Sequence, residues 1–523
     1  MTHAPYPKAA SADIAMLLEG TFPFVSGGVS SWVNQIIRAF PDYTFALIFI
    51  GSRPEDYGQP KYELPPNVVH LETHYIHTQI DIPLIRRQRG DPATFGDVEA
   101  MHEYFRAPHA SPDGANAFER LSRELLPGGK LDRDTFLFSE ASWDFIKTKY
   151  REHSIDPSFV DFFWTIRAMH QPIWTMAQIA ESLPEVRAFH TISTGYAGFL
   201  GALLKRRRGR PLILSEHGIY TKERKIDLFQ SEWITDNRNV FQKDPTEISY
   251  FRQLWMRLFE SFGKLCYDAA DDIIALYEAN RQRQIQDGAE PARTRNIPNG
   301  INLKALSPLR QQRPAETPPI LCLIGRVVPI KDIKTFIRAM RTVVNRIPQA
   351  EGWIAGPEDE SPEYAEECKN LVISLGLEKN VKFLGFQKIP DLLPKIGLMV
   401  LSSISEALPL VILEGYAAGV PTISTDVGSC RQLVYGFDDA DRAIGASGRI
   451  VGIADPLALA NAAIELLLDP AAWQAASQAA IERVERYYTQ DMMFGQYRSV
   501  YERALSLPVP SLPGAAGQCP RRG

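Results

Sequence analysis

Two glutamates separated by seven residues stand out in the second half of the sequence. Glu406 and Glu414 lie between Ser402 and Pro421, directly after the apolar run Leu398–Leu401. We expect Glu406 in the loop at the carboxyl end of a strand and Glu414 about one and a half turns into the following helix. Because one carboxylate can accept two hydroxyl hydrogen bonds, both residues suit a ribose diol or sugar hydroxyls. The spacing alone is also compatible with two solvated glutamates beside a buried helix.

Two cations follow an earlier apolar run. The predicted strand Ile320–Ile324 ends in Gly325 and Arg326, and Lys331 comes just before a predicted helix. A helix N-terminus favours anions because its backbone N–H groups are free and its dipole is positive there. Arginine can bind phosphate oxygens bidentately, and lysine adds a compact charge. The loop therefore suits a diphosphate, although a surface loop with two ordinary cations fits equally well in isolation.

A pair of glycines opens the first predicted helix. The strand Ile14–Leu18 leads into a loop in which Gly27 and Gly28 precede an amphipathic stretch. Glycines at a helix start allow close approach of a ligand and leave N–H groups free to donate. A simple tight turn is the alternative.

The elements that must position these residues alternate in the way typical of parallel β-α-β units. In the first half the predicted strands are Ile14–Leu18, Phe45–Ile50, Val68–Leu71, Val186–Thr191, Leu212–Ser215 and Ile273–Tyr277. Between about residues 80 and 180 the alternation stops, and we expect a mostly helical insertion. We interpret its aromatic residues as core packing; they include Phe136, Phe138, Trp143, Phe145, Phe162, Phe163 and Trp164.

The alternation restarts after a polar, proline-bearing stretch, residues 307–319, which we interpret as a linker. The predicted strands there are Ile320–Ile324, Gly352–Ala355, Val381–Leu384, Leu398–Leu401 and Thr422–Ser424. The predicted helices are Ile333–Asn345, Tyr364–Ser374, Leu410–Ala418, Leu457–Leu468, Ala471–Tyr487 and about Met492–Leu505. We expect an α/β protein of two doubly wound, Rossmann-like domains facing across a cleft, with ligands at the carboxyl ends of the strands.

The expected domain limits follow from this pattern. Residues 1–306 form the N-terminal domain with its insertion, and residues 307–487 form the C-terminal, nucleotide-sugar-binding domain. Residues 488–507 form a helix that packs back on the first domain, and the Pro/Gly-rich residues 508–523 are disordered.

Composition excludes several classes of protein. A formal net charge of -5 gives no bulk attraction to nucleic acid or anionic lipid. The five cysteines form no CxxC pair, which indicates reduced thiols. The sequence has no apolar stretch of the roughly 18–20 residues that a spanning helix needs and no visible signal peptide, so we expect a cytoplasmic protein. It also lacks a P-loop and a complete GxGxxG, so the ATPase and dehydrogenase fingerprints are missing.

Three further patterns are set aside. The Asp-x-Asp triplets at 132–134 and 439–441 do not follow apolar strands, and we interpret both as solvated loops. His70, His74 and His77 match no metal-ligand spacing, and we interpret them as part of a surface loop. The basic run 205–208 suits a helix end, with a partner or membrane contact as the alternative.

Four motifs in the second half, taken together, resemble those of retaining GT-B glycosyltransferases of the glycogen synthase and sucrose synthase type. They are the Gly325-Arg326…Lys331 loop, the Glu406…Glu414 pair, the segment Pro298-Asn299-Gly300-Ile301 and the turn Phe383-Leu384-Gly385-Phe386. The resemblance implies transfer with retention of anomeric configuration, without a metal or another cofactor.

The resemblance also implies roles for individual residues. Arg326, Lys331, His217 and Glu406 would be catalytic, with His217 and Glu406 at the donor sugar. Glu414 would bind ribose. The remaining donor-binding positions would be Gly27, Gly28, Gly325, Gly385, Phe386, Leu408, Pro409 and Leu410. On the acceptor side it implies His190, Glu216 and Arg224.

The segments LLEGTFPFVSGGVSSWV and SEHGIYTKERKIDL, with the insertion, resemble the PelF family, cytosolic glycosyltransferases of bacterial Pel exopolysaccharide assembly. That resemblance implies a UDP-sugar donor, a growing polysaccharide acceptor and inner-membrane Pel synthesis and export proteins as partners. It leaves open whether the donor carries a glucose-type or an N-acetylgalactosamine-type sugar.

Two alternatives to a transferase stay open at this point. One is a GT-B enzyme of different chemistry, such as a nucleotide-sugar epimerase or a phosphorylase, although no lysine-bearing site for pyridoxal phosphate is evident. The other is a non-catalytic nucleotide-sugar sensor or scaffold.

Overall fold

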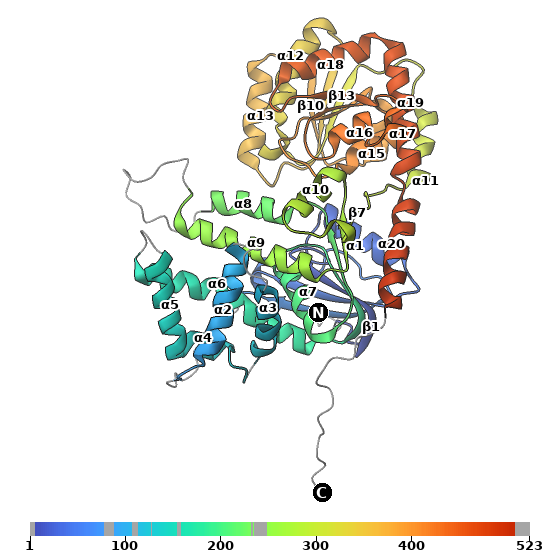
Figure 1. Cartoon of the computed structure of the whole chain (residues 1–523). Helices are drawn as coiled ribbons and strands as arrows, with labels where there is room; N and C mark the ends of the chain where they lie inside the picture. Colours follow the sequence, from blue (N-terminus) through green and yellow to red (C-terminus); the bar gives the residue numbers. More distant parts are fainter. Residues whose placement is uncertain are drawn as a thin grey trace. The chain divides into compact units, whose positions relative to one another are not determined.

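The computed structural model describes residues 6–77, 88–106, 113–126, 128–153, 158–231, 234 and 248–507. It divides into two compact units (Figure 1). Unit 1 comprises residues 1–275, 281–295 and 498–523, and unit 2 comprises residues 276–280 and 296–497. Each unit is built on its own parallel sheet with helices against it, so the predicted fold class, two Rossmann-like α/β domains, is confirmed.

The sheet of unit 1 has seven strands in the order β3-β2-β1-β4-β5-β6-β7. β1 lies inside the sheet because it is paired in parallel on both sides, with Ile14 opposite Phe45 of β2 and Ala188 of β4. Its apolar side chains from Ile14 to Leu18 are almost completely buried. The strands are β1 (Ser11–Glu19), β2 (Phe45–Gly51), β3 (Val68–Tyr75), β4 (Glu185–Thr191), β5 (Leu212–Glu216), β6 (Asp272–Ala275) and β7 (Thr294–Asn296).

Four longer helices accompany this sheet in chain order. They are α1 (Gly28–Ala39), α7 (Tyr196–Arg208), α8 (Tyr220–Gln230) and α9 (Tyr250–Ala269), followed by the shorter α10 (Glu278–Gln286). The predicted basic run lies in the last turn of α7, which ends at the left-handed Gly209. Its four cations contact groups of the same unit, as with Lys205 and Asp271 at 2.7 Å, which supports the helix-end interpretation.

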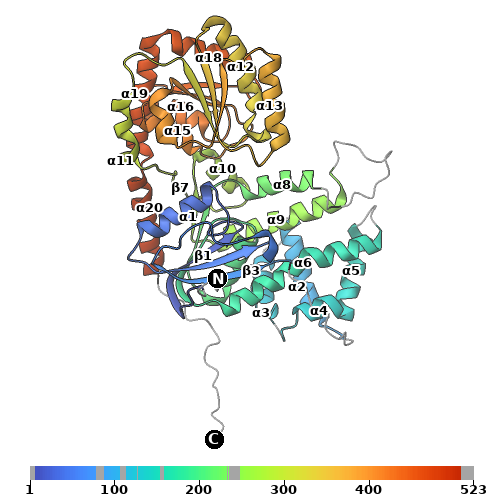
Figure 2. The ribbon, with the colours of Figure 1, turned by 180° about the vertical axis from the view of Figure 1, so that it is seen from behind.

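The predicted helical insertion lies between β3 and β4. Its helices are α2 (Pro92–Arg106), α3 (Asp113–Glu124), α4 (Arg133–Phe138), α5 (Glu140–His153) and α6 (Phe159–Ser182). They gather beside α9 in both views (Figure 1 and Figure 2). Phe136 and Phe162 are each only 2% exposed and belong to the core of unit 1, as expected. The core interpretation is wrong for Trp143 and Trp164, which are 46% and 61% exposed because they lie on the outer faces of α5 and α6.

The sheet of unit 2 has six strands in the order β10-β9-β8-β11-β12-β13, and every pairing is parallel. The strands are β8 (Ile320–Ile324), β9 (Glu351–Ala355), β10 (Val381–Gly385), β11 (Leu398–Leu401), β12 (Thr422–Thr425) and β13 (Gly448–Val451). The main helices are α12 (Ile333–Arg346), α13 (Pro362–Ser374), α15 (Leu410–Ala417), α18 (Pro456–Leu468) and α19 (Pro470–Tyr487). α12 and α18 pack side by side (Figure 2).

Apart from residues 276–280, unit 2 begins at residue 296, about ten residues before the boundary that we expected at 306/307. The stretch that we interpreted as a linker is fastened within unit 2. The Arg310 guanidinium donates to the carbonyl of Ala417 at 2.7 Å, and Arg313 donates to the carbonyls of Leu393 and Ile396 at 2.8 and 2.9 Å. These bonds were invisible in the composition, which shows only prolines and polar residues.

The last described helix, α20 (Gln490–Ser506), is divided between the units at Tyr497 and Arg498. Within unit 1, Tyr501 is fully buried and stacks edge-on against Phe40. Arg503 binds Asp272 at 2.8 Å. Residues 508–523, for which we expected disorder, lie outside the described residues. No helix in the described ranges is long and apolar enough to cross a membrane.

Candidate functional site

The loops after β8 and β11 meet through one ion pair. These strands are neighbours in a parallel sheet, so their carboxyl ends lie at the same edge. The Lys331 ammonium lies 2.5 Å from Oε1 of Glu406. The Ser403 hydroxyl donates to the same carboxylate oxygen at 2.7 Å. Both members of the pair are mostly buried, with side chains 22% and 15% exposed.

Backbone contacts fix the two loops against each other. The Ser402 hydroxyl donates to the carbonyl of Lys331 at 2.8 Å, and the amide of Ile404 donates to the carbonyl of Ile330 at 2.8 Å. Asp332 adopts a left-handed conformation and caps α12 by accepting from Thr335. The lysine and the glutamate are therefore held on rigid supports, as a preorganised charged site requires.

Arg326 lies on the same loop as Lys331 but has another partner. Its guanidinium binds Glu360 at 2.5 Å, and the two side chains are 56% and 50% exposed. Such an exposed pair contributes little to stability, so an incoming anion can replace the glutamate at small cost. Sequence reasoning missed Glu360, which lies 34 residues further along the chain.

Glu414 lies on α15, the helix that follows the loop carrying Glu406, and it is half-buried. Burial raises the pKa of its carboxyl to about 7. No group within the described part of the chain donates a hydrogen bond to it. A half-buried carboxyl with spare hydrogen-bonding capacity is a candidate ligand-binding group.

The start of α15 is shaped by a residue that sequence reasoning missed. Pro409 is the N-cap of the helix, and Leu408 before it is buried, 6% exposed. Gly428, after β12, packs against this loop so closely that a Cβ there would lie 2.2 Å from the carbonyl oxygen of Glu406. Its φ of +53° also favours glycine. A glycine four residues after the predicted strand Thr422–Ser424 was the available signal.

Two more expected donor residues lie at the end of β10. Gly385 has a φ of +62°, and a Cβ there would meet no atom within 4 Å. Phe386 is 77% exposed. A large aromatic side chain left in solvent beside an open backbone position offers a surface for a flat ligand group such as a base.

The glycine pair of unit 1 is placed as predicted, with Gly27 as the N-cap of α1 and Gly28 as its first residue. No side chain caps the helix. A Cβ at either glycine would meet nothing within 4 Å, so the space beside this backbone is open. Amides left free in this way are suited to an anion or a sugar hydroxyl.

The two histidines expected near the sugars differ in their bonding. His190 is fully buried, with Nδ1 2.8 Å from the Tyr501 hydroxyl and Nε2 2.8 Å from the Ser215 hydroxyl. Burial, assisted by His217, lowers the pKa of His190 to about 3. His217 packs edge-on against Trp32 at 4.6 Å, and its buried Nε2 has no hydrogen-bond partner in the described residues. Burial lowers the pKa of His217 to about 4, so it is a neutral ring with one open nitrogen.

Glu216 is a buried hydrogen-bond centre, 2% exposed. Its carboxylate accepts from the Tyr267 hydroxyl at 2.8 Å, the Gln284 amide at 3.0 Å, the Tyr220 backbone at 3.0 Å and the Thr194 hydroxyl at 3.2 Å. Burial raises its pKa. Both of its carboxylate oxygens therefore already accept hydrogen bonds within unit 1.

Arg224, the third acceptor-side residue, lies on α8 over the ring of Phe259, at 4.8 Å from the ring centroid. Glu19, at the end of β1, was missed although it directly follows the predicted strand Ile14–Leu18. It accepts from the Tyr220 hydroxyl at 2.8 Å and from the Ala197 amide at 3.1 Å.

The patterns set aside in the sequence are partly corrected. The solvated-loop interpretation is wrong for Asp441, which is fully buried and binds Arg483 at 2.6 Å, and for Asp132, which caps α4. His70 and His74 lie on β3, not in a surface loop, and share Glu72 at 2.9 and 3.0 Å. No cluster of three or more potential metal ligands occurs in the described ranges.

Comparison with known proteins assigns the two halves. Residues 12–292 match the family described as Domain of unknown function (DUF3492), which covers more than half of the chain. The chain belongs to the DUF3492 family. Residues 308–483 match Glycosyl transferases group 1, so unit 2 is a group 1 glycosyltransferase domain that follows the DUF3492 part. The finding supports the resemblance to GT-B glycosyltransferases.

Two curated relatives illustrate the range of similarity. N-acetyl-alpha-D-glucosaminyl L-malate synthase of Bacillus anthracis is 29% identical over 188 residues, 36% of this chain and 46% of that protein. An exopolysaccharide phosphotransferase of Streptomyces coelicolor is 28% identical over 243 residues, 46% of this chain and 24% of that protein. The chain spans about half or less of the length of these relatives.

Solved structures share the fold over nearly the whole chain. HepE of Anabaena in complex with UDP superposes with a TM-score of 0.54 at 16% identity, covering 94% of this chain and 100% of HepE. Sucrose-phosphate synthase of Thermosynechococcus elongatus gives a TM-score of 0.53 at 18% identity, covering 94% and 98%. At this identity the comparison shows the fold, which is GT-B.

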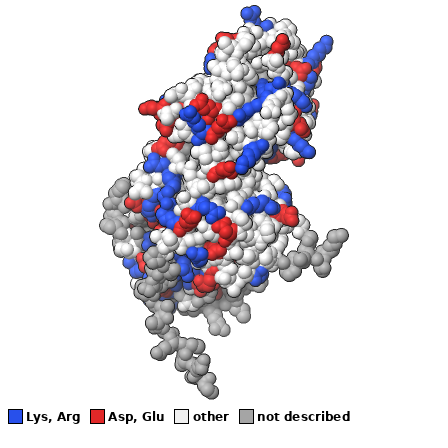
Figure 3. All heavy atoms as spheres, turned by 90° about the vertical axis from the view of Figure 1, so that its right-hand side faces the viewer, with Lys and Arg blue, Asp and Glu red and all other residues white. Residues whose placement is uncertain are grey.

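The site's charges are local. On the face drawn in Figure 3, Lys and Arg lie among Asp and Glu instead of forming one patch of a single sign. Binding of an anionic group must therefore depend on particular residues such as Lys331 and Arg326, as the modest net charge of -5 already indicated.

Proposed function

We propose that this protein is a retaining, metal-independent glycosyltransferase that moves a sugar from a UDP-sugar donor to a growing exopolysaccharide. The observation that carries the proposal is the Lys331–Glu406 pair, 2.5 Å apart, at the carboxyl ends of neighbouring strands in a group 1 domain. That edge of a parallel sheet is where ligands of such folds bind.

The chemistry follows from the charges on this edge. Cleavage of the bond between sugar and diphosphate leaves negative charge on the departing oxygen. We assign Lys331 and Arg326 to that charge, because fixed cations near a leaving group stabilise the transition state without reorganisation. The diphosphate replaces the exposed Glu360 as the partner of Arg326. Gly325 and the open backbone at Gly385 allow close approach of the donor.

Glu414 and Glu406 recognise hydroxyls in this proposal. Ribose hydroxyls donate to Glu414, and a donated hydrogen bond to the ionised form lowers the raised pKa of that carboxyl again. Glu406 positions the donor sugar. Leu408, Pro409 and Leu410 fix the helix start that carries these groups, and Phe386 offers its ring to the base.

Unit 1 contributes its own groups. We assign His217 to the transferred sugar because its buried Nε2 has no partner among the described residues. The free amides at Gly27 and Gly28 can bind anionic oxygen. On the acceptor side we assign Arg224 to contact, and His190 and Glu216 to positioning, because their hydrogen bonds are already made within the unit.

The choice of donor and acceptor is supported by similar proteins. HepE was crystallised with UDP and with UDP-glucose, and one curated relative acts in exopolysaccharide metabolism by name. With the sequence resemblance to the PelF family, this supports a Pel-type polymer as acceptor. The resemblance to the PelF family also supports inner-membrane Pel proteins as partners, and a cytoplasmic location at that membrane.

The test is a panel of UDP- and ADP-sugars incubated with the protein and a polysaccharide acceptor, with and without chelator. We expect UDP release with a UDP-sugar, unchanged by chelator, and NMR of the first-formed linkage should show the donor's anomeric configuration. An inverted linkage contradicts retention. Isomerised donor without acceptor would indicate an epimerase, and nucleotide binding in calorimetry without UDP release would indicate a sensor.

A further inference from the structure

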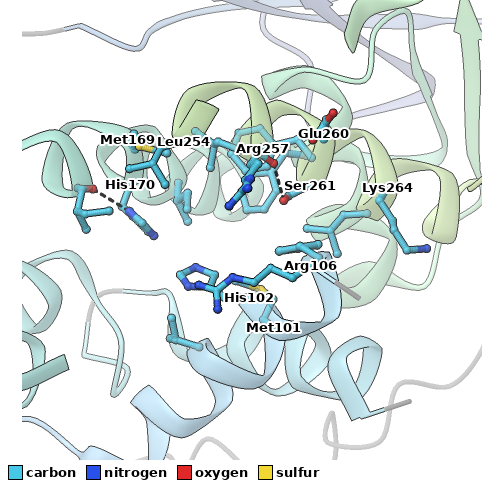
Figure 4. A pocket seen from close by; sticks show the side chains of 18 of the residues that line it. Met101, His102, Arg106, Met169, His170, Leu254, Arg257, Glu260, Ser261 and Lys264 are labelled. Atoms are coloured by element: carbon cyan, nitrogen blue, oxygen red, sulfur yellow. Dashed lines mark hydrogen bonds between the residues drawn. The ribbon is translucent and has the colours of Figure 1, made fainter. Parts of the chain in front are cut away.

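A cavity of about 910 Å³ lies in unit 1, and none of the residues assigned to sugar transfer lines it. The insertion helices α2 to α6 line it together with residues of α7, α8, α9 and α10, and Figure 4 shows part of this lining. A volume of this size is at the upper end of the range for small-molecule sites. The sugar-transfer proposal leaves it without a role.

The inner wall of the cavity is apolar. Six of the buried side chains that line it are no more than 3% exposed: Phe118, Leu121, Phe136, Phe162, Trp174 and Phe199. The indole N–H of Trp174 is already donated to the carbonyl of Leu131 at 2.9 Å, so it presents only its ring. Such a wall favours a hydrocarbon chain, since each buried methylene contributes about 0.8 kcal/mol.

The polar groups of the cavity are mostly cationic, and most of them are already neutralised. Lys225 binds Glu260 at 2.5 Å, Lys264 binds Asp268 at 3.2 Å, and Arg283 binds Asp287 at 2.9 Å. Lys149 also has acidic partners, Glu99 and Glu152. These four cations are therefore balanced by the protein itself.

Two guanidinium groups are left over. Arg257 on α9 makes no ion pair or side-chain hydrogen bond within the described residues, and Arg106 on α2 donates only to Nε2 of His153, at 3.0 Å. Figure 4 shows both side chains extending into the cavity from its opposite walls. Both also act electrostatically on Tyr250, which lines the same space. The nearby carboxylates of Glu152 and Glu260 are already paired with lysines, so two like charges that converge here favour an anion between them.

A third polar group is also unused. The His102 imidazole lies in the cavity beside Arg106 and has no hydrogen-bond partner in the described ranges (Figure 4). Burial, with His170 as the next cause, lowers the pKa of His102 to about 3, so the ring is neutral and can donate or accept without adding charge. The cavity thus combines an apolar interior with a small cationic and polar end.

We propose that this cavity binds an anionic amphiphile, with the head group between Arg106 and Arg257 and a long hydrocarbon chain along the apolar wall. The head group is a phosphate or a carboxylate, both of which arginine binds bidentately. The site is separate from sugar transfer and does not depend on the proposed donor chemistry.

The experiment is calorimetric titration of the full chain with hexadecyl phosphate, palmitate, dodecyl phosphate, hexadecanol and inorganic phosphate, each below its aggregation limit. We expect saturable 1:1 binding of hexadecyl phosphate or palmitate, and the stronger of the two identifies the head group. Shortening the chain to dodecyl phosphate should weaken binding on the order of 100-fold. Hexadecanol and inorganic phosphate should each bind far more weakly.

Substitutions locate the site. The double variant Arg106→Gln, Arg257→Gln should weaken binding of the anionic amphiphile about 10- to 100-fold, because charge-assisted hydrogen bonds are lost. Leu254→Trp should block the cavity and abolish it. Arg123→Gln is the matched control, since that arginine pairs with Glu119 on the exposed face of α3 and should leave affinity unchanged. Thermal unfolding checks that each variant is folded.

Several results would overturn the proposal. They are absence of amphiphile binding to the unsubstituted chain, equal affinity for hexadecanol, affinity for inorganic phosphate equal to that for hexadecyl phosphate, and binding that survives both the double variant and Leu254→Trp. A cavity occupied by a peptide segment of a partner protein would give the first of these results.

Discussion

The polar groups singled out in unit 1 and in unit 2 differ in how much of their bonding capacity the fold uses. In unit 1, Glu216 accepts four hydrogen bonds and His190 is bonded through both ring nitrogens. In unit 2, Glu414 receives no hydrogen bond in the described ranges, and Arg326 holds only an exposed glutamate. A saturated group stabilises the fold, whereas a group with spare capacity can bind a ligand. The comparison separates structural from functional residues better than residue type does.

The largest expected effect concerns the fixed cation of unit 2. Lys331→Ala should lower kcat about 10²- to 10³-fold, because it removes a preorganised charge from the leaving group. UDP release under saturating donor measures this. Lys334→Ala is the matched control, since that lysine of α12 pairs with Glu367 of α13 and its loss should leave kcat unchanged. Full turnover by the Lys331→Ala variant would contradict a catalytic role for unit 2.

The next effect concerns the saturated carboxylate of unit 1. Glu216→Ala should lower the free energy of unfolding by about 3 kcal/mol or more, because it leaves several buried donors without an acceptor. Denaturant unfolding measures it. Glu414→Ala in unit 2 should cost far less stability, since no donor in the described residues depends on that carboxylate. Equal losses in the two variants would contradict the distinction between the units.

The two buried histidines test the comparison inside unit 1. His190→Phe should cost about 1–3 kcal/mol of stability, because the hydroxyls of Tyr501 and Ser215 lose their partner. His217→Phe keeps an aromatic ring against Trp32 and removes Nε2, which has no partner among the described residues, so stability should hold while UDP release falls about tenfold or more. Thermal unfolding and turnover are measured on both variants. If the His217 variant lost stability and the His190 variant lost only turnover, the roles assigned to the two histidines would be exchanged.

A smaller effect concerns the pH dependence of donor binding. Burial raises the pKa of Glu414 to about 7, so below that pH the carboxyl is increasingly protonated and loses acceptor capacity. Donor KM should therefore rise on acidification, by up to about tenfold per pH unit below pH 7, and level off above it. Glu414→Gln should raise KM at neutral pH and flatten this profile. An unsubstituted protein whose KM stays constant from pH 5 to 8 would contradict a ligand role for this carboxylate.

The smallest effect concerns the exposed pair. Glu360→Gln frees Arg326 without moving it, so donor KM should fall about two- to threefold while stability stays constant. Donor titrations at low and high salt measure this. The difference between the variant and the unsubstituted protein should shrink at high salt, because screening weakens the competing pair. A rise in KM would mean that Glu360 itself contacts the donor.

Local sequence pattern predicted most of the strands and the loops that carry many of the candidate site residues, because apolar runs and the residues after them are neighbours in the chain. Lys331 and Glu406, 75 residues apart, could be brought together in advance because each follows a strand of one parallel sheet. The short β13 was missed, since Gly448 and Arg449 interrupt its apolar character. Partnerships between distant side chains were also missed: Asp441 resembles a solvated residue until Arg483, 42 positions away, is placed beside it.

The division of α20 between the two units has a consequence for synthesis on the ribosome. Unit 1 contains residues from the beginning of the chain and residues from Arg498 onward, among them Tyr501, which fills a buried position beside Phe40 and His190. An emerging polypeptide thus cannot complete unit 1 until residues beyond Arg498 have been synthesised. A fragment that stops near residue 296 lacks Tyr501, so the position that this side chain fills should be empty and exposed. A separate peptide of residues 490–507 should bind there and fill it.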